Sequence, residues 1–381
     1  MEKKKILFIY YKLYRAGGIT RVLVNLVNEL VEKYDITLLI LTEKQEPFYP
    51  IDSRVKIIYK NIYEHWAYTK LCVGIDRYAK WIPKRRNIKY YLVDFAAHQI
   101  LNTWLNKNGK KYDTIVTCMY KLSATASINS KVNFKTIGWE HTGYKGRGII
   151  FGNILQKKLQ KLKGIITINK ESLEYYQKYG NVYLIHNIVG EPFESIIKTN
   201  KENLITYVGR LDQDKNVIEL LEIIKEVQLP INWKLQIIGD GPETQNLIQF
   251  VQENKLENQV KFLGLKNIDE VVKLLSKSKI FAFISLKEAL PTILIEALFC
   301  GNVLVSYDCN YGPSSIINEK NGFLIPLRDK KVFREKLTYL IQNPKKLEKL
   351  CASAYTSAES WKKEKVISHW NEVLSNDKGL S

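Results

Sequence analysis

Two cations lie close together in a loop that is predicted to follow a strand. Arg210 and Lys215 are five positions apart. Both could therefore reach one diphosphate, the arginine as a planar fork and the lysine as a compact point charge. Each charge-assisted contact would contribute about 1.5–3 kcal/mol. A solvated loop with two exposed cations is the alternative interpretation.

Two carboxylates flank the start of an apolar helix predicted further along the chain. Glu288 lies just before this helix and Glu296 in its second turn, with Pro291 at the start, a position that proline favours. A carboxylate within an apolar helix is costly without a partner, and sugar hydroxyls would be suitable partners. Alternatively, Glu288 is only a charge at a helix N-terminus, and Glu296 lies on an exposed face.

A glycine pair follows the first predicted strand. Gly17 and Gly18 precede a helix, and such a turn lets backbone amides approach a phosphate. Because a glycine pair is more often only a turn, this signal alone is weak.

The elements that must position these residues are short apolar strands alternating with longer helices, a pattern that predicts an α/β fold with parallel sheets covered on both faces. Strands are predicted over 5–10, 35–41, 55–59, 114–118, 135–139, 164–168, 204–208, 234–238, 260–263, 280–284 and 302–306, and helices over 20–32, 88–106, 217–227 and 270–276. The series restarts near residue 200, after an irregular segment over 186–203 that is typical of a linker. In such sheets, ligands bind beyond the carboxyl ends of the strands.

Together these motifs resemble the retaining GT-B glycosyltransferases known as glycosyl transferases group 1, which include bacterial lipopolysaccharide and capsule hexosyltransferases. The resemblance spans about four fifths of the chain, and such an ordered series of motifs is hard to obtain by chance. The matched residues are Gly17-Gly18, Gly209-Arg210-Leu211 with Lys215, Ile238-Gly239-Asp240-Gly241-Pro242, Phe262-Leu263-Gly264, the Glu-(x)7-Glu pair Glu288 and Glu296, and Asn321-Gly322-Phe323-Leu324-Ile325.

The resemblance implies two Rossmann-like, doubly wound parallel-sheet domains that face each other across a cleft. Residues 1–187 would form the acceptor-side domain and residues 188–355 the donor-binding domain. Residues 356–381 would form a helix that crosses back to the first domain.

The resemblance also implies roles for individual residues. Glu288 would contact the transferred sugar, and His141, in a Trp-Glu-His segment that ends a strand, would face the reaction centre; a lone histidine is more often structural or exposed. Gly239, Gly264 and Leu265 would lie near the nucleotide base. The other donor-binding residues would be Gly17, Gly18, Arg210, Lys215, Leu290, Pro291, Thr292, Ile293, Leu294 and Glu296, with backbone amides from Leu290 to Leu294 as anion contacts.

The implied reaction transfers a hexosyl or N-acetylhexosaminyl unit, with retention, from a nucleoside diphosphate sugar, most simply a UDP-sugar. The acceptor would be a glycan or a lipid-linked glycan in surface polysaccharide or glycoconjugate synthesis. The family usually has glycine where Ala289 stands, which leaves the donor sugar open. A GT-B-fold sugar-nucleotide epimerase and a basic nucleic-acid-binding protein are the alternatives, although the latter has no recognisable nucleic-acid-binding motif here.

The formal net charge of +19 fits anionic small substrates, nucleic acid or an anionic membrane surface. Basic and aromatic residues alternate over 60–91, so we expect a membrane or acceptor patch that includes Trp81, Lys84, Arg85, Arg86 and Lys89. A solvated face with its aromatic side chains turned into the core is the alternative.

The remaining sequence features concern the compartment and cofactors. Five widely spaced cysteines without a CxxC pair favour reduced thiols and no structural metal. No cofactor or metal is expected. No apolar run is long enough to span a bilayer, and the N-terminus lacks an export signal. We therefore expect a cytoplasmic protein, either free or peripheral on the inner face of the plasma membrane.

Overall fold

A computed structural model describes residues 2–15, 17–72, 75, 77, 85–144, 155–310 and 312–376, with the backbone alone at 72 and 85–90. The chain divides into two compact units. Unit 1 contains Met1–His186 and Ile367–Ser381, and unit 2 contains Asn187–Val366. The chain therefore passes between the units twice, and the predicted boundary at 187/188 lies beside the first passage.

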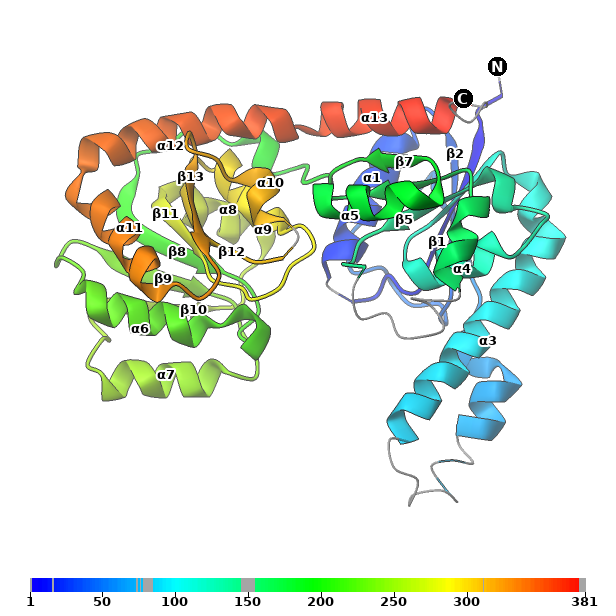
Figure 1. The fold of residues 1–381 in the computed structure, drawn as a ribbon, viewed down its shortest axis with the longest axis horizontal. Coiled ribbons are helices and arrows are strands. Elements are labelled where there is room, and N and C mark those ends of the chain that lie inside the picture. The colour runs from blue at the N-terminus through cyan, green and yellow to red at the C-terminus, as the bar shows by residue number, and fades with distance from the viewer. Residues whose placement is uncertain are drawn as a thin grey trace. The chain divides into compact units, whose positions relative to one another are not determined.

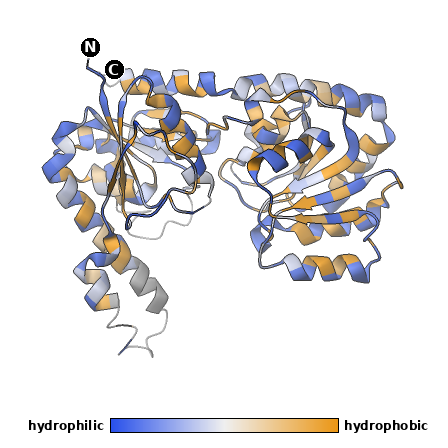
Figure 2. Ribbon diagram, turned by 180° about the vertical axis from the view of Figure 1, so that it is seen from behind, coloured by the Kyte–Doolittle hydropathy of each residue, from blue (hydrophilic) through white to orange (hydrophobic). Residues whose placement is uncertain are grey.

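Unit 1 contains a seven-stranded parallel sheet in the order β3-β2-β1-β4-β5-β6-β7 (Figure 1). The order reverses direction between β1 and β4. Most of its strands are apolar and buried because helices cover both faces of the sheet, which Figure 2 shows as orange strands between helices of mixed colour. The strands are β1 Lys5–Tyr10, β2 Asp35–Ile40, β3 Lys56–Tyr59, β4 Thr114–Thr117, β5 Thr136–Glu140, β6 Gly164–Thr167 and β7 Val182–Leu184.

The helices of unit 1 include one from the far end of the chain. They are α1 Gly18–Leu30, α3 Arg85–Asn108, α4 Tyr120–Ser127, α5 Lys170–Tyr176 and the end of α13 Lys363–Ser375, with a π-helical turn at Ala67–Cys72. Trp370 of α13 is fully buried, and its ring centroid lies 6.0 Å from that of Phe8 and 4.8 Å from that of Trp139. The C-terminal segment thus completes the core of unit 1.

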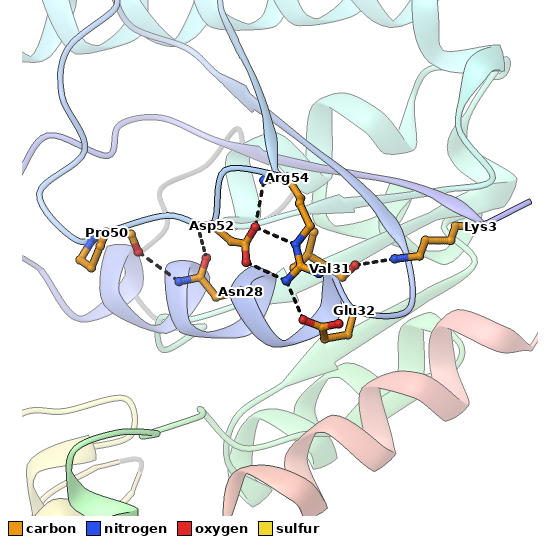
Figure 3. A network of polar contacts seen from close by, with 7 residues as sticks. All are labelled: Lys3, Asn28, Val31, Glu32, Pro50, Asp52 and Arg54. Atoms are coloured by element: carbon orange, nitrogen blue, oxygen red, sulfur yellow. Dashed lines mark hydrogen bonds and ion pairs between the residues drawn. The ribbon is translucent and has the colours of Figure 1, made fainter.

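The long connection from β2 to β3 is fixed to α1 by a polar network (Figure 3). Arg54 donates to Asp52 at 2.8–2.9 Å and to Glu32 at 2.6 Å. Asn28 donates to the Pro50 carbonyl at 3.0 Å and accepts from the Asp52 amide at 2.9 Å. Hydrogen bonds from Arg54 lower the pKa of Asp52 to about 2. This loop is therefore held on the helix rather than free in solvent.

Unit 2 contains a six-stranded parallel sheet in the order β10-β9-β8-β11-β12-β13. Here the order reverses between β8 and β11. The strands are β8 Glu202–Val208, β9 Lys234–Ile238, β10 Val260–Gly264, β11 Ser278–Phe283, β12 Val303–Asp308 and β13 Gly322–Pro326. The helices are α6 Val217–Val227, α7 Thr244–Glu253, α8 Ile268–Lys277, α9 Thr292–Phe299, α10 Pro313–Ile316, α11 Lys330–Gln342 and α12 Pro344–Ala358.

The two doubly wound parallel sheets confirm the predicted fold class, and β1, β9 and α6 have the predicted bounds. The first division between the units, after His186, falls at the start of the segment predicted as a linker over 186–203, and Ile188, Val189 and Phe193 of that segment are buried. One expectation differs from the structure. The segment over 356–381 is not one helix: α12 ends at Ala358, a 3-10 turn covers Glu359–Trp361, and α13 follows.

Candidate functional site

The reversal of strand order in unit 2 brings the two predicted motif loops together. Arg210 and Lys215 follow β8, and Glu288 follows β11, its neighbour in the sheet. The Leu286 amide donates to the Asp214 carbonyl at 2.9 Å, so the loops also share a backbone hydrogen bond. Ligands of open α/β sheets bind at such a reversal.

Lys215 and Glu288 form an ion pair in which Nζ donates to Oε1. Both side chains are largely shielded from solvent, where an ion pair is screened less than at the surface. Tyr207 lies beneath this pair; burial raises the pKa of its hydroxyl, and the nearby Glu288 charge adds to the effect. The site therefore presents one cation that already has an anionic partner.

The turn that carries Lys215 is fixed by residues that the sequence did not single out. Asp212 accepts from the Lys215 amide, and Asn216 has the left-handed conformation with φ 54°. Asn216 Nδ2 donates to Glu219 Oε2 at 2.8 Å, and the Tyr307 hydroxyl donates to the other oxygen of that buried carboxylate. Asn216 was the one local sequence signal for this turn, because asparagine adopts the left-handed conformation more readily than most residues.

Arg210 has a different environment from Lys215. Its side chain is 69% exposed, and Nε lies 3.4 Å from Asp212 Oδ2. Arg210 thus lies beside Asp212 and Lys215 beside Glu288, and the convergence of both cations on one diphosphate stays a prediction. Because an exposed pair of this kind is weak, the Arg210 guanidinium can exchange Asp212 for another anion.

The helix after β11 corrects part of the predicted amide site. Pro291 is the residue before α9, not its first residue, and has no N–H, while the Leu294 amide donates to the Pro291 carbonyl at 3.0 Å. The amides of these two residues therefore cannot bind an anion, which leaves those of Leu290, Thr292 and Ile293. Glu296 is only 4% exposed, so the alternative that it lies on an exposed face is wrong.

Of the two glycines predicted near the nucleotide base, Gly239 is needed for close backbone packing, whereas a Cβ at Gly264 would meet no atom within 4 Å. A Cβ at Gly239, where φ is 137°, would lie 1.9 Å from the Gly209 carbonyl oxygen. The Gly239 amide also donates to the Gly264 carbonyl at 2.9 Å. These contacts explain the glycine at 239 without a ligand. Leu265, by contrast, is an exposed apolar side chain that a planar base could cover.

The predicted residues of unit 1 lie near its own strand-order reversal. Gly17 has an extended backbone, Gly18 begins α1, and a Cβ at Gly18 would meet no atom within 4 Å. Space is therefore open above these two glycines.

His141 follows β5 directly and is 5% exposed, with its ring centroid 4.1 Å from that of Trp139. Burial lowers the pKa of His141 to about 3. Within the described part of the chain, neither ring nitrogen has a hydrogen-bond partner. A buried imidazole without partners is costly, so this histidine is neutral and able to accept or donate one proton.

The predicted basic patch falls mostly on residues that the structure does not describe in full. Trp81 and Lys84 lie outside the described residues, and Arg85, Arg86 and Lys89 are described by their backbone in α3 only. Nearby, Trp66 and Tyr91 are 53% and 55% exposed. The alternative that the aromatic side chains of this segment face the core is therefore wrong for these two.

Over the residues that the structure describes, no three His, Cys, Asp or Glu side chains are grouped as metal ligands. Nor is any described helix both long and apolar enough to cross a membrane. Cys118, Cys300, Cys309 and Cys351 are free and buried, and burial raises the pKa of each thiol.

The chain is similar in sequence and in fold to known glycosyltransferases. The chain is 25% identical over 387 residues to amylovoran biosynthesis glycosyltransferase AmsD of Erwinia amylovora, covering 97% of this chain and 99% of that protein. It is 25% identical over 389 residues (98% and 99%) to a Campylobacter jejuni alpha-1,4-N-acetyl-D-galactosaminyltransferase named for a diphospho-undecaprenol-linked substrate. The solved structure of Anabaena HepE in complex with UDP aligns with a TM-score of 0.69 at 16% identity, covering 97% of this chain and 99% of that one.

The two Rossmann-like units with parallel sheets define a GT-B fold. Residues 191–357, which lie within unit 2, match the family model described as glycosyl transferases group 1. The two loops that meet at the strand-order reversal of unit 2, after β8 and β11, lie within this matched stretch.

Proposed function

We propose that this protein transfers a hexosyl or N-acetylhexosaminyl unit from a UDP-sugar to a glycan or lipid-linked glycan, with retention, in surface polysaccharide or glycoconjugate synthesis. The contact between Lys215 and Glu288 at the strand-order reversal carries this proposal. In this proposal Lys215 would bind a phosphate of the donor, and Glu288 beside it would accept from hydroxyls of the sugar.

The comparisons support the two substrates separately. UDP is the ligand in the HepE structure, which supports a uridine nucleotide as the carrier. The printed name of the Campylobacter relative includes a diphospho-undecaprenol-linked glycan, which supports a lipid-linked acceptor.

The proposed step breaks the bond between sugar C1 and the diphosphate oxygen, and the electron pair leaves with the diphosphate. The acceptor hydroxyl oxygen bonds to C1 on the same face, and its proton passes to the departing diphosphate. Lys215 and Arg210 would stabilise the charge that develops on the leaving group. In this proposal Glu288 holds the transferred sugar, Glu296 the ribose, and His141 a sugar hydroxyl, without a cofactor or metal.

The test is a screen in which the protein is incubated with individual nucleotide sugars and released nucleotide is measured. A UDP-sugar should give release, and Lys215→Ala should lower turnover at least tenfold, which corresponds to about 1.4 kcal/mol. Lys225→Ala, an exposed lysine on α6, is the matched control and should keep the full rate.

Other outcomes of the same screen would contradict the proposal. Conversion of a UDP-sugar into its epimer without release would favour the epimerase. A product with inverted anomeric configuration, read by NMR, would overturn retention. Binding to DNA that weakens steeply with salt, without any nucleotide release, would favour a nucleic-acid-binding protein.

We also propose that unit 1 docks peripherally on the anionic inner face of the plasma membrane, because exposed Trp66 and Tyr91 flank a basic segment. Amphipathic aromatic side chains favour the headgroup layer, and each basic residue near the surface adds about 1 kcal/mol. The protein should co-sediment with anionic but not neutral vesicles, and less so at high salt. Binding that survives replacement of Lys84, Arg85, Arg86 and Lys89 by Ser would contradict this docking.

A further inference from the structure

A groove of about 650 Å³ lies on unit 1 between α3 and β3. Because β3 is the edge strand of the sheet, β2 separates this groove from the strand-order reversal at β1 and β4. The groove is therefore a second concave surface, distinct from the loops that follow β1.

One wall of the groove is a row of side chains on α3. Gln99, Thr103 and Lys107 are spaced four residues apart, so they lie above one another on the same helix face. This row is about 12 Å long at 1.5 Å per residue. All three side chains are exposed, and none makes a hydrogen bond or ion pair with another described side chain or backbone group. Their donors and acceptors are thus available to a ligand.

The opposite side of the groove is cationic. Lys60 follows β3, and His65 lies in the next turn. The Ala67 amide donates to His65 Nδ1 at 3.3 Å. The proton of the neutral imidazole is therefore on Nε2, which makes this atom a donor. Lys60 and Lys107 are thus the two cations that line the groove, and no carboxylate is among its described lining residues.

The floor between these walls is apolar. It is formed by Trp104, which is mostly buried, and by Ile58 and Ile100. An indole with hydroxyl and amide groups beside it suits a ligand that has both an apolar face and many hydroxyls. The lysines add a preference for negative charge.

We infer that this groove binds an oligosaccharide segment that bears carboxylate or phosphate groups, separately from the site of transfer. The inference deepens the proposed function, because it names a glycan class that the transferase would hold. Pyranose faces would cover Trp104, hydroxyls would bond to Gln99 and Thr103, and the acidic groups would pair with Lys60 and Lys107.

The test is isothermal titration of the full-length protein with a tetrasaccharide of galacturonic acid, with the neutral galactose tetrasaccharide of the same linkage, and with inorganic phosphate alone. The acidic tetrasaccharide should bind about tenfold more tightly than the neutral one, and phosphate alone should not displace it. Lys60→Gln combined with Lys107→Gln should lower the affinity for the acidic tetrasaccharide by about tenfold.

The matched control is Lys110→Gln combined with Lys131→Gln, which removes the same charge from exposed positions outside the groove. This variant should bind as the unmodified protein does. Thr103→Phe keeps both groove lysines but fills the space between the walls, and it should abolish binding.

Several outcomes would overturn the inference. They are equal affinity for both tetrasaccharides, full competition by phosphate, equal losses in the groove and control variants, wild-type binding by Thr103→Phe, or no binding at all. The titration uses no nucleotide sugar. Its result is therefore independent of the nucleotide-release screen. Glycan binding in the titration with no release in the screen would refute the proposed function and not the groove. Release in the screen with no glycan binding in the titration would refute the groove and not the proposed function.

Discussion

The two carboxylates of the Glu-(x)7-Glu pair, Glu288 and Glu296, differ in what surrounds them. Glu288 pairs with Lys215 on a loop, whereas Glu296 is buried inside α9. Glu288→Gln should lower turnover and alter the sugar preference without weakening the binding of free UDP, because the substitution releases Lys215 to pair with the phosphates. Glu296→Gln should mainly weaken the binding of UDP. Calorimetry measures the UDP affinity of both variants, and a loss of affinity in Glu288→Gln but not in Glu296→Gln would show that the two roles are reversed.

His141 should make the protein acid-sensitive. Its pKa is about 3 in the folded state against roughly 6.5 when unfolded. The stability that depends on the neutral ring is therefore complete above pH 6.5 and is lost as pH falls toward 3. At pH 5 the loss is about 2 kcal/mol. Chemical unfolding at pH 7 and pH 5 measures it.

The variant His141→Phe serves as the comparison for this effect. It should lose less stability between the two pH values, although the pKa of His98 and of His186 is also lowered by burial. Equal losses in both proteins would show that His141 does not cause the acid sensitivity. Nearly unchanged stability at pH 7 with reduced transfer would favour its role in the reaction over a structural one.

At the scale of elements, the turn between β8 and α6 depends on β12, which lies two strands away from β8 in the sheet. Tyr307 of β12 donates to Glu219, which holds Asn216 next to Lys215. Tyr307→Phe leaves a buried carboxylate with one donor fewer, a cost of about 1–3 kcal/mol. We expect lower thermal stability of unit 2 and weaker UDP binding. Tyr339→Phe, at an exposed ring, should change neither.

Two glycines that follow strands, one in each unit, should respond in opposite ways to alanine. Gly239→Ala should destabilise unit 2 by more than about 3 kcal/mol, because the new methyl group meets the Gly209 carbonyl and the φ of 137° is strained. Gly18→Ala has open space and should leave stability unchanged. If a phosphate approaches Gly18, as the family resemblance implies, this variant should still lose turnover. Thermal melts and nucleotide release distinguish the two effects.

The strands that define the reversal of sheet order could be predicted from their apolar runs, and with them the proximity of Lys215 and Glu288. The strands β7 and β13 were not predicted, because β7 has only three residues, none of them fully buried, and most apolar residues of β13 are partly exposed. Tyr307 and Glu219 are 88 positions apart, and no local pattern relates them. Likewise, the burial of His141 depends on Trp139, whose packing is not encoded in the strand pattern.

At the scale of the whole molecule, the two passages of the chain between the units lie near one shared contact. Glu194 accepts hydrogen bonds from the Gly190 amide at 3.1 Å and from the Lys363 amide at 3.0 Å. Gly190 stands four positions after His186, where the first segment of unit 1 ends, and Lys363 stands three positions before Val366, the last residue of unit 2. One carboxylate thus joins both connecting segments.

Unit 1 should depend on α13 while unit 2 does not. Trp370→Ala removes a fully buried indole that contacts Phe8 and Trp139, which should cost about 3–5 kcal/mol. Hydrogen exchange should rise in the strands of unit 1 and stay unchanged in those of unit 2. Ser368→Ala, at an exposed position of the same helix, is the control. Equal loss of protection in both units would contradict this independence.

The same discontinuity sets an order of events during translation. Residues 187–366 form a continuous unit and leave the ribosome before α13 is complete. Unit 2 can therefore fold while unit 1 still lacks Trp370. Until the last turns of α13 emerge, Phe8 and Trp139 remain without the side chain that covers them. During that interval the first-synthesised half of the protein is the half that is exposed to chaperones and to aggregation.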